Sequence, residues 1–267
     1  MNKKITFFLF AVIACCGLLF SFDKNEEPTV IYMIGDSTMA NKSTKNNNQE
    51  RGWGHMFPCI TSHEIKISNH AMNGRSSKSF RQEGRWEPIM EKMKPGDYVF
   101  IQFGNNDEKK EREELYADSH TDFKDNLKRY IVETREKGGI PVLFTSIARR
   151  HFDDEGNLTD THGHYITAVF EVGEEMGVPV IDMNKSTTAM ILAVSQEESK
   201  KFFMWVGEKK DNTHLNIYGG KVVAKLAADE LARTIPELAR YMPYEDSECY
   251  GEVHEFTEQI WNNLNNQ

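Results

Sequence analysis

The chain has no excess of basic residues. Its 41 aspartates and glutamates outnumber its 32 lysines and arginines, which gives a formal net charge of -9. Without Lys3 and Lys4, 30 basic residues stand against 41 acidic ones, a net charge of -11. Nucleic acid is bound through phosphate neutralisation by basic side chains, so this balance argues against a nucleic-acid partner. It also argues against an anionic polymer held by bulk charge, and an anionic substrate would need a local arginine cluster.

Cysteine is scarce as well, and its placement gives no sign of a zinc module. There are four cysteines, with no Cys-x-x-Cys pair and no zinc-ligand spacing. His162-Gly163-His164 offers two ligands but no third at ligand spacing, so a loop or helix-start role is favoured and no metal is expected. Cys59 and Cys249 could pair in an oxidising compartment or remain buried free thiols, and the sequence leaves both open.

The first 22 residues have the pattern of a secretory signal peptide. Two lysines precede an almost wholly apolar run over residues 5–22, and a polar stretch begins at Asp23. A membrane anchor is the alternative, because the run approaches spanning length. Residues 12–15, Val-Ile-Ala-Cys, also fit a bacterial lipobox, in which a lipidated Cys15 would attach the protein to a membrane. We expect an exported bacterial protein that is periplasmic, extracellular or an outer-membrane lipoprotein.

Residues 23–267 suit a single α/β domain, because short apolar runs alternate with amphipathic stretches and no internal repeat appears. Strands are expected over residues 29–34, 64–68, 97–103, 140–146 and 178–182. Helices are expected over residues 86–93, 122–137, 163–176 and 217–234, and the segment after Pro243 could be a further helix. Strands that alternate with helices predict a parallel sheet covered on both faces.

Three residues that could take part in catalysis follow successive predicted strands. Ser37 comes after the first strand, Gly74 after the second and Asn106 after the third. Each has an ordinary explanation when taken singly, namely a helix N-cap, an Asn-Gly turn and a polar turn. In a parallel sheet, however, ligands bind beyond the carboxyl ends of the strands, which share one edge. There, the Gly74 N–H and the Asn106 amide could stabilise an oxyanion formed at Ser37.

Asp211 and His214 complete this set. A serine hydroxyl is a poor nucleophile until a base takes its proton, and the base needs a carboxylate to fix its tautomer. Asp211 lies three residues before His214, so one short loop could hold both. A serine, an aspartate and a histidine in this order predict acyl transfer through a serine ester.

These residues stand in four blocks that resemble those of the SGNH (GDSL-type) esterases. The blocks are Gly35-Asp36-Ser37, Gly74, Gly104-Asn105-Asn106-Asp107 and Asp211-Asn212-Thr213-His214. Thr38 replaces the usual leucine after the serine. The resemblance implies an α/β/α sandwich with a flavodoxin-like sheet of five parallel strands. It also implies that Ser37 is the nucleophile, His214 the base and Asp211 the carboxylate that orients it. Ser37, Gly74 and Asn106 would form the oxyanion hole. No metal or organic cofactor is implied.

Two stretches resemble the rhamnogalacturonan acetylesterase branch in particular. They are Gly-Asp-Ser-Thr-Met-Ala over residues 35–40, and Asn-Gly-Arg-Ser-Ser-Lys-Ser-Phe followed by Glu-Gly-Arg-Trp within residues 73–86. This likeness implies removal of acetyl groups from a plant cell-wall polysaccharide, pectic rhamnogalacturonan. Arg75 and Arg85 are candidates for a sugar-acid carboxylate and Trp86 for stacking on a sugar ring, with surface ion pairing and core packing as the alternatives.

Two other functions remain open. The same residues could hydrolyse acetyl-xylan, short aryl esters or a lipid ester, or pass the acetyl group to a second sugar. A lipid substrate would require an apolar lid, and the sequence has no long apolar loop. From another class, the protein could be a glycan-binding lipoprotein on an inactive esterase scaffold. A binding protein has no need of Ser37, Asp211 and His214 together, which favours the enzyme.

Overall fold

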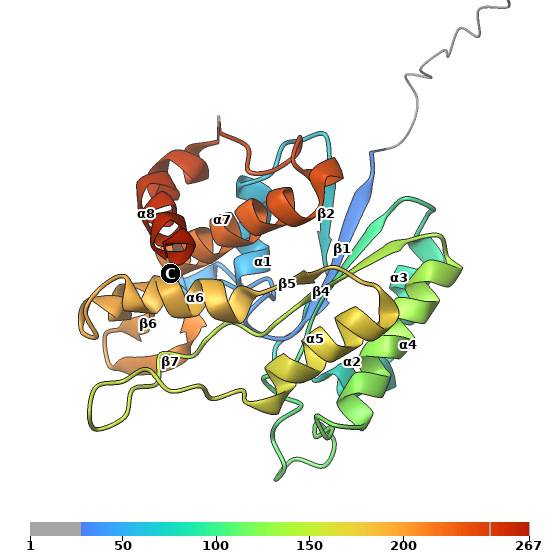
Figure 1. Ribbon diagram of the computed structural model, residues 1–267, viewed down its shortest axis with the longest axis horizontal. Coiled ribbons are helices and arrows are strands. Elements are labelled where there is room, and N and C mark those ends of the chain that lie inside the picture. Colours follow the sequence, from blue (N-terminus) through green and yellow to red (C-terminus); the bar gives the residue numbers. More distant parts are fainter. Residues whose placement is uncertain (1–27, 246, 267) are drawn as a thin grey trace, which may run out of the picture.

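Figure 1 shows the computed structural model, in which residues 28–245 and 247–266 are described. The predicted signal peptide and Cys15 lie outside these residues. All five predicted strands are present and form one parallel sheet in the order β2-β1-β3-β4-β5. Their bounds are β1 Val30–Gly35, β2 Lys66–Asn69, β3 Tyr98–Gln102, β4 Ile140–Phe144 and β5 Val180–Ile181.

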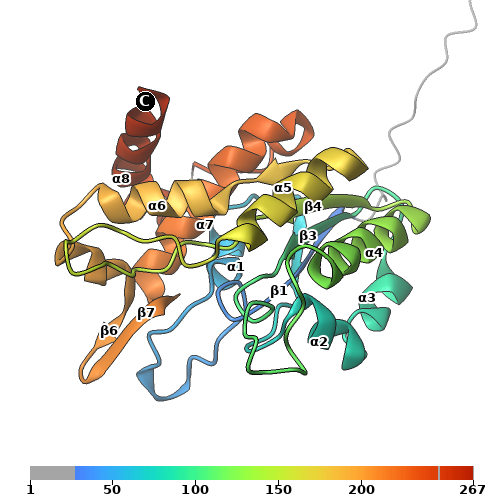
Figure 2. The same cartoon turned by 60° about the horizontal axis from the view of Figure 1, so that its bottom comes forward.

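Helices cover both faces of this sheet, as Figures 1 and 2 show. One face carries α2 Ser77–Gln82, α3 Glu87–Lys92, α4 Asp122–Glu136 and α5 His164–Met176. The other carries α1 Trp53–Met56, α6 Met183–Leu192, α7 Ile217–Thr234 and α8 Glu248–Asn265. The four predicted helices correspond to α3, α4, α5 and α7. The segment after Pro243 contains α8, which packs on α6 and α7.

The two cores follow from the alternation of side chains along each strand. In β1, Ile31 and Met33 belong to the core beneath α7, while Tyr32 and Ile34 belong to the core beneath α4. Because both faces of the strand are buried, its sequence Val-Ile-Tyr-Met-Ile-Gly is continuously apolar rather than alternating. The predicted three-layer α/β/α sandwich is therefore confirmed.

The strand order places three loops side by side. β1 lies between β2 and β3, so the loops that leave the carboxyl ends of these three strands emerge at neighbouring positions. The chain goes from β1 to β2 on one side and then crosses to β3 on the other. This reversal of strand order is the usual ligand site of open α/β sheets, and it positions the predicted site at the β1 loop.

Near the C-terminus, the structure corrects one expectation about the catalytic residues and answers the question that the sequence left open about the cysteines. Asp211 and His214 lie on strand β7 Lys209–Leu215, which pairs antiparallel with β6 Phe203–Val206, so a simple short loop is corrected to a strand hairpin. Cys59 and Cys249 form a disulfide between the turn after α1 and the first turn of α8. This bond fixes α8 to the body of the domain.

The described part of the chain contains no helix that combines the length and the apolar character needed to span a bilayer.

Candidate active site

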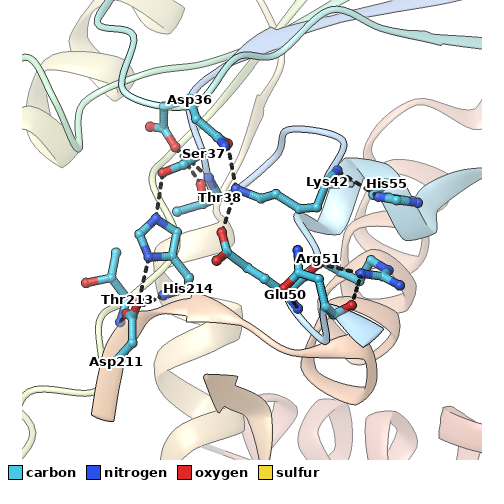
Figure 3. Close-up of polar contacts among 12 residues, drawn as sticks. Asp36, Ser37, Thr38, Lys42, Glu50, Arg51, His55, Asp211, Thr213 and His214 are labelled. Carbon is cyan, nitrogen blue, oxygen red and sulfur yellow. Dashed lines mark hydrogen bonds and ion pairs between the residues drawn. The ribbon is translucent and has the colours of Figure 1, made fainter. Parts of the chain in front are cut away.

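Ser37, His214 and Asp211 form one continuous hydrogen-bonded chain (Figure 3). His214 Nε2 lies 2.9 Å from Ser37 Oγ, and His214 Nδ1 lies 2.8 Å from Asp211 Oδ2. Since the carboxylate can only accept, Nδ1 carries a proton and Nε2 is left to accept from the serine hydroxyl. The three residues predicted from the sequence are therefore brought together in the arrangement that activates a serine.

The Asp-x-x-His spacing lets one carboxylate hold both the backbone and the ring. Asp211 Oδ1 accepts from the N–H groups of Thr213 at 2.9 Å and His214 at 3.0 Å, while Oδ2 accepts from the His214 ring. Burial alone would raise the pKa of Asp211, but the hydrogen bonds from His214 and Thr213 outweigh it and lower that pKa well below its usual range. The carboxylate therefore stays ionised and keeps the histidine in one tautomer.

His214 projects from an irregular part of β7. Phe203 pairs with Leu215 and Met204 with Asp211, so the ladder shifts register and Asn212, Thr213 and His214 are extra residues on this strand. Bulges of this kind redirect side chains beside active sites. Here the bulge turns the imidazole towards Ser37.

Asn212 anchors the bulge to the rest of the domain. Its Oδ1 accepts from Trp205 Nε1 at 2.8 Å and from an Arg150 guanidinium nitrogen at 3.0 Å. Its carbonyl accepts from the Arg150 N–H at 2.8 Å. Arg150 is itself buried and bonded to Ser199 and the Gln196 carbonyl. The position of His214 thus depends on a hydrogen-bonded polar cluster behind the hairpin.

The residues around Ser37 explain the rest of its motif. A Cβ added to Gly35 would lie 2.6 Å from the Gln102 carbonyl oxygen, so β1 can approach β3 here only with glycine. Asp36 is fully buried and accepts from the Thr38 N–H at 2.8 Å, the Thr38 hydroxyl at 2.9 Å and Asn105 Nδ2 at 3.1 Å. The Thr38 hydroxyl bond shows why threonine can follow the serine in this chain.

Three N–H donors border the space beside Ser37 Oγ. Gly74 has φ = +75°, a conformation that favours glycine, and it lines the same pocket as Ser37 and Asn106. Within residues 28–245 and 247–266, the backbone N–H groups of Ser37 and Gly74 have no protein acceptor. Asn106 Nδ2 donates to the Arg75 carbonyl at 3.0 Å, and an amide carries a second N–H. The arrangement can receive a developing oxyanion.

Asn105 and Asp107 on either side of Asn106 support the loop instead. Asn105 binds Asp36 with its amide nitrogen and accepts from Arg149 with its oxygen. Asp107 accepts from Ser77 and from the Gly104 N–H, which ties the β3 loop to α2. Burial raises the pKa of Asp107 to about 7, although the hydrogen bonds from Ser77 and Gly104 oppose this shift.

Each of the three residues predicted to contact the substrate is paired with a glutamate. Arg75 and Arg85 both pair with Glu83, at 2.9 Å and 2.6 Å, which is the surface ion pairing that the sequence left open. Trp86 is 1% exposed and donates to Glu133 at 2.6 Å while its ring packs on Tyr130. The expectation that Trp86 stacks on a sugar ring is therefore wrong, because the ring belongs to the core beneath α4.

The pocket that contains Ser37 is open, is lined mainly by polar and charged residues, and has a volume of about 630 Å³. Sequence patterns identified Ser37, Gly74, Asn106 and His214 as members of its lining. The remaining members come from loops without a periodic pattern, except for Thr213 on β7, and they are Glu50, Asn73, Asn105, Glu108, Lys109, Arg149 and Thr213. Four of these are charged, so the pocket suits a hydroxyl-rich ligand better than an acyl chain.

In the part of the chain that the structure describes, no cluster of three or more histidine, cysteine or carboxylate ligands could hold a metal ion. His162, one of the two histidines near the start of α5, is buried and used elsewhere. Its Nδ1 lies 3.1 Å from Glu108 and its Nε2 lies 3.0 Å from the Ile147 carbonyl oxygen. His162 thus supports the loops around the pocket, the loop role expected from the sequence.

An α/β sandwich with a hydrogen-bonded serine, histidine and aspartate beside the carboxyl edge of its parallel sheet is the arrangement of a serine hydrolase. The family model described as GDSL-like Lipase/Acylhydrolase matches residues 33–220, and the chain belongs to this family.

Curated relatives cover most of the chain. Rhamnogalacturonan acetylesterase RhgT of Bacillus subtilis is 36% identical over 213 residues, 76% of this chain and 90% of the relative. A rhamnogalacturonan acetylesterase of Emericella nidulans is 28% identical over 73% of this chain and 81% of its own.

Solved structures agree on the fold. The crystal structure of YxiM from Bacillus subtilis superposes with a TM-score of 0.70 at 29% identity, over 78% of this chain and 57% of that one. Axe2, an acetylxylan esterase from Geobacillus stearothermophilus, superposes with a TM-score of 0.58 at 17% identity, over 76% of this chain and 94% of its own. At that identity the second likeness shows the fold alone.

Proposed function

We propose that the protein is an exported carbohydrate esterase that removes O-acetyl groups from pectic rhamnogalacturonan. The observation that carries the proposal is the hydrogen-bonded chain Ser37–His214–Asp211 in an open pocket lined mainly by polar and charged residues. The protein chain is also 36% identical to RhgT over 90% of that enzyme's length. The E. nidulans relative with the same activity in its name adds support from a distant organism.

In the proposed reaction, His214 Nε2 takes the hydroxyl proton of Ser37 as Oγ attacks the acetyl carbonyl carbon. The tetrahedral oxyanion accepts hydrogen bonds from the Ser37 N–H, the Gly74 N–H and the Asn106 amide. The C–O bond to the sugar then breaks, and the sugar oxygen leaves with the proton from His214. Water, deprotonated by His214, attacks the acetyl-enzyme and releases acetate, which restores the Ser37 hydroxyl.

The shape of the surface around Ser37 supports a polymeric substrate. The pocket shares Asn73 with a neighbouring hollow of about 570 Å³ that includes Asn41, His70 and Arg85. It shares Glu108 with another hollow of about 560 Å³ beside the start of α5. An acetyl group is much smaller than the pocket and the two adjoining hollows together. The hollows are therefore available to the sugar residues on either side of the one that carries the acetyl group.

Export rests on two observations. The apolar run over residues 5–22 follows two lysines and precedes a polar stretch, as in a signal peptide. The Cys59–Cys249 disulfide is the kind of bond that persists in oxidising compartments. Cleavage near residues 22–23 and attachment through a lipidated Cys15 are the two alternatives within the proposal, and intact-mass analysis of the native protein decides between them.

The function is tested by measuring acetate release from acetylated rhamnogalacturonan, with acetyl-xylan and an aryl acetate in parallel. We expect the purified protein to act on all three and to have its highest kcat/KM on rhamnogalacturonan. The Ser37→Ala variant, which loses one oxygen at a loop end, should keep its melting temperature and release no acetate.

The outcomes separate mechanism from substrate. A preference for acetyl-xylan would overturn the pectic assignment and retain the esterase. Hydrolysis of the aryl acetate without any release from either polysaccharide would overturn the carbohydrate substrate. Substantial activity in Ser37→Ala would contradict the mechanism itself.

A further inference from the structure

A buried lysine lies beneath the active-site pocket. Only 3% of the Lys42 side chain is exposed, and its ammonium contacts Glu50 Oε1 at 2.9 Å (Figure 3). The ammonium also donates to Asn73 Oδ1 at 2.6 Å. Asn73 precedes Gly74, one of the three proposed oxyanion donors. Lys42 therefore connects the oxyanion side of the pocket to the carboxylate of Glu50.

Glu50 continues this connection to the acid–base side. Its second oxygen, Oε2, lies 3.1 Å from Lys209 Nζ, and Lys209 Nζ lies 3.5 Å from Asp211 Oδ2. That Asp211 oxygen is the one bonded to the His214 ring. Alternating charges thus run from Lys42 through Glu50 and Lys209 to Asp211. We refer to Lys42, Glu50 and Lys209 as the ionic bridge.

The backbone around Glu50 is tied to the same hairpin. Glu50 forms an antiparallel bridge with Asn216, and the Arg51 N–H donates to the Leu215 carbonyl at 2.9 Å. Segments that are far apart in the sequence therefore meet at Glu50. Because this residue also lines the pocket with Ser37 and His214, its carboxylate lies where it can influence the reacting groups.

The charges of the bridge are mutually stabilised. Burial lowers the pKa of Lys42, while the hydrogen bond that its ammonium donates to Glu50 opposes this shift. Burial would raise the pKa of Glu50, but Lys42, Lys209 and nearby His214 outweigh it and lower that pKa. Glu50 is therefore an anion at neutral pH.

The charged groups around Glu50 come from several elements. Lys42 belongs to its own loop, and Lys209, Asp211 and His214 belong to β7. Asp36 acts on Lys42 from the β1 loop. The pocket lining adds three charged residues from the β3 and β4 loops, which are Glu108, Lys109 and Arg149.

We propose that Glu50 is a positioning residue for the reaction of the proposed esterase. Held between Lys42 and Lys209, it fixes the Asp211–His214 hairpin against the oxyanion loop. Its negative charge also stabilises the imidazolium that forms at His214 in the transition state. The inference rests on the proposed role of His214 as the base, but not on the identity of the polysaccharide.

The decisive variant is Glu50→Gln, which keeps the size of the side chain and removes its charge. With an aryl acetate, whose small leaving group makes few contacts in the pocket, we expect kcat to fall roughly tenfold and KM to change little. The acid limb of kcat/KM reports protonation of the free base. An anion beside a base favours the protonated form, so the limb should move to lower pH by roughly half a unit in this variant.

Three controls separate this role from a merely structural one. Glu50→Asp keeps the charge and should leave the acid limb at its wild-type position. Glu197→Gln removes a surface carboxylate that is 79% exposed and pairs with Lys200, and it should change neither kcat nor the limb. The double variant Lys42→Met/Glu50→Gln removes both members of the ion pair, so no unpaired cation is left buried. The shift of the acid limb should persist in this variant.

An acid limb that stays in place in both charge-removing variants, measured well below their melting temperatures, would overturn the inference. So would a limb that moves equally in Glu50→Asp. These results are distinguishable from failure of the proposed function. Acetate release by wild type from acetylated rhamnogalacturonan, and its loss in Ser37→Ala, test that function without reference to Glu50.

Discussion

At the scale of single residues, Asp211 shows how one carboxylate does two tasks. Oδ1 closes a turn on the N–H groups of Thr213 and His214, and Oδ2 orients the imidazole. The spacing of three residues is needed for this, because the carboxylate then reaches backbone and ring of the same histidine. Sequence alone predicted this pair, since its geometry is local.

Asp211→Asn should lower kcat by about 10⁴-fold, the loss known for the same change in another serine hydrolase, because the histidine loses its enforced tautomer.

The Asp211→Asn variant should also change the pH dependence of stability. The folded-state pKa of Asp211 lies below the unfolded value of about 3.9, so its stabilisation is present above that pH and is lost as pH falls through the folded value. Denaturant unfolding should therefore show the wild-type advantage shrink between about pH 6 and about pH 3. A constant difference over that range would contradict the lowered pKa.

The neighbours Asn105 and Asn106 provide a matched pair of variants. Asn106→Ala removes a proposed oxyanion donor and should lower kcat by roughly 10²–10³ with little change in KM. Asn105→Ala removes a bond to buried Asp36 and should mainly lower the melting temperature. The steady-state kinetics of both variants with one acetyl ester, together with their thermal unfolding, test the two assigned roles. Equal, small kinetic effects would remove Asn106 from the oxyanion hole.

At the scale of elements, long periodic segments were predictable and short irregular ones were not. The helix over residues 217–234 coincides with α7, because its apolar positions face the core beneath the sheet. The β6–β7 hairpin was missed, since a bulge breaks its alternation and its turn at Gly207 follows only four strand residues. The sequence pattern therefore identified Asp211 and His214 as the catalytic pair, but the prediction that they lie in a short loop was wrong, because they lie on a strand.

The disulfide acts on α8 rather than on the active site. It joins Cys59, in the turn after α1, to Cys249 in the first turn of α8, across 190 residues of sequence. The Cys59→Ser/Cys249→Ser variant should lose about 2–5 kcal/mol of unfolding free energy and keep its kcat at moderate temperature. Denaturant unfolding and aryl acetate kinetics of the two proteins provide the comparison. A large fall in kcat at full folding would show that α8 influences the catalytic hairpin.

At the scale of the whole molecule, the pocket is assembled from loops that only the fold brings together. Ser37, Gly74 and Asn106 could be predicted because each follows a strand and the strand ends share an edge. Lys42 and Glu50 lie in a polar loop with no periodicity, and Lys209, the second partner of Glu50, is 159 residues away from it. Trp86 was misassigned because its partner Glu133 comes from α4, a contact that depends on tertiary packing.

The exported state belongs to the whole chain and is open to a direct test. Intact-mass analysis of the native protein should show a mature form that starts either at a lipidated Cys15 or near residues 22–23. The two forms differ in mass by the leader residues and the lipid, so one spectrum separates them. Soluble cytoplasmic protein that retains Met1 would contradict export.

The assignment of Ser37 as the nucleophile is tested most directly by trapping it. A serine-reactive phosphonate should inactivate the protein and leave one covalent adduct, which peptide mass spectrometry should locate on Ser37. Asp211→Asn should react far more slowly, because activation of the hydroxyl depends on an oriented His214. An adduct on another residue, or an adduct that forms equally well on the Ser37→Ala variant, would contradict the proposed mechanism.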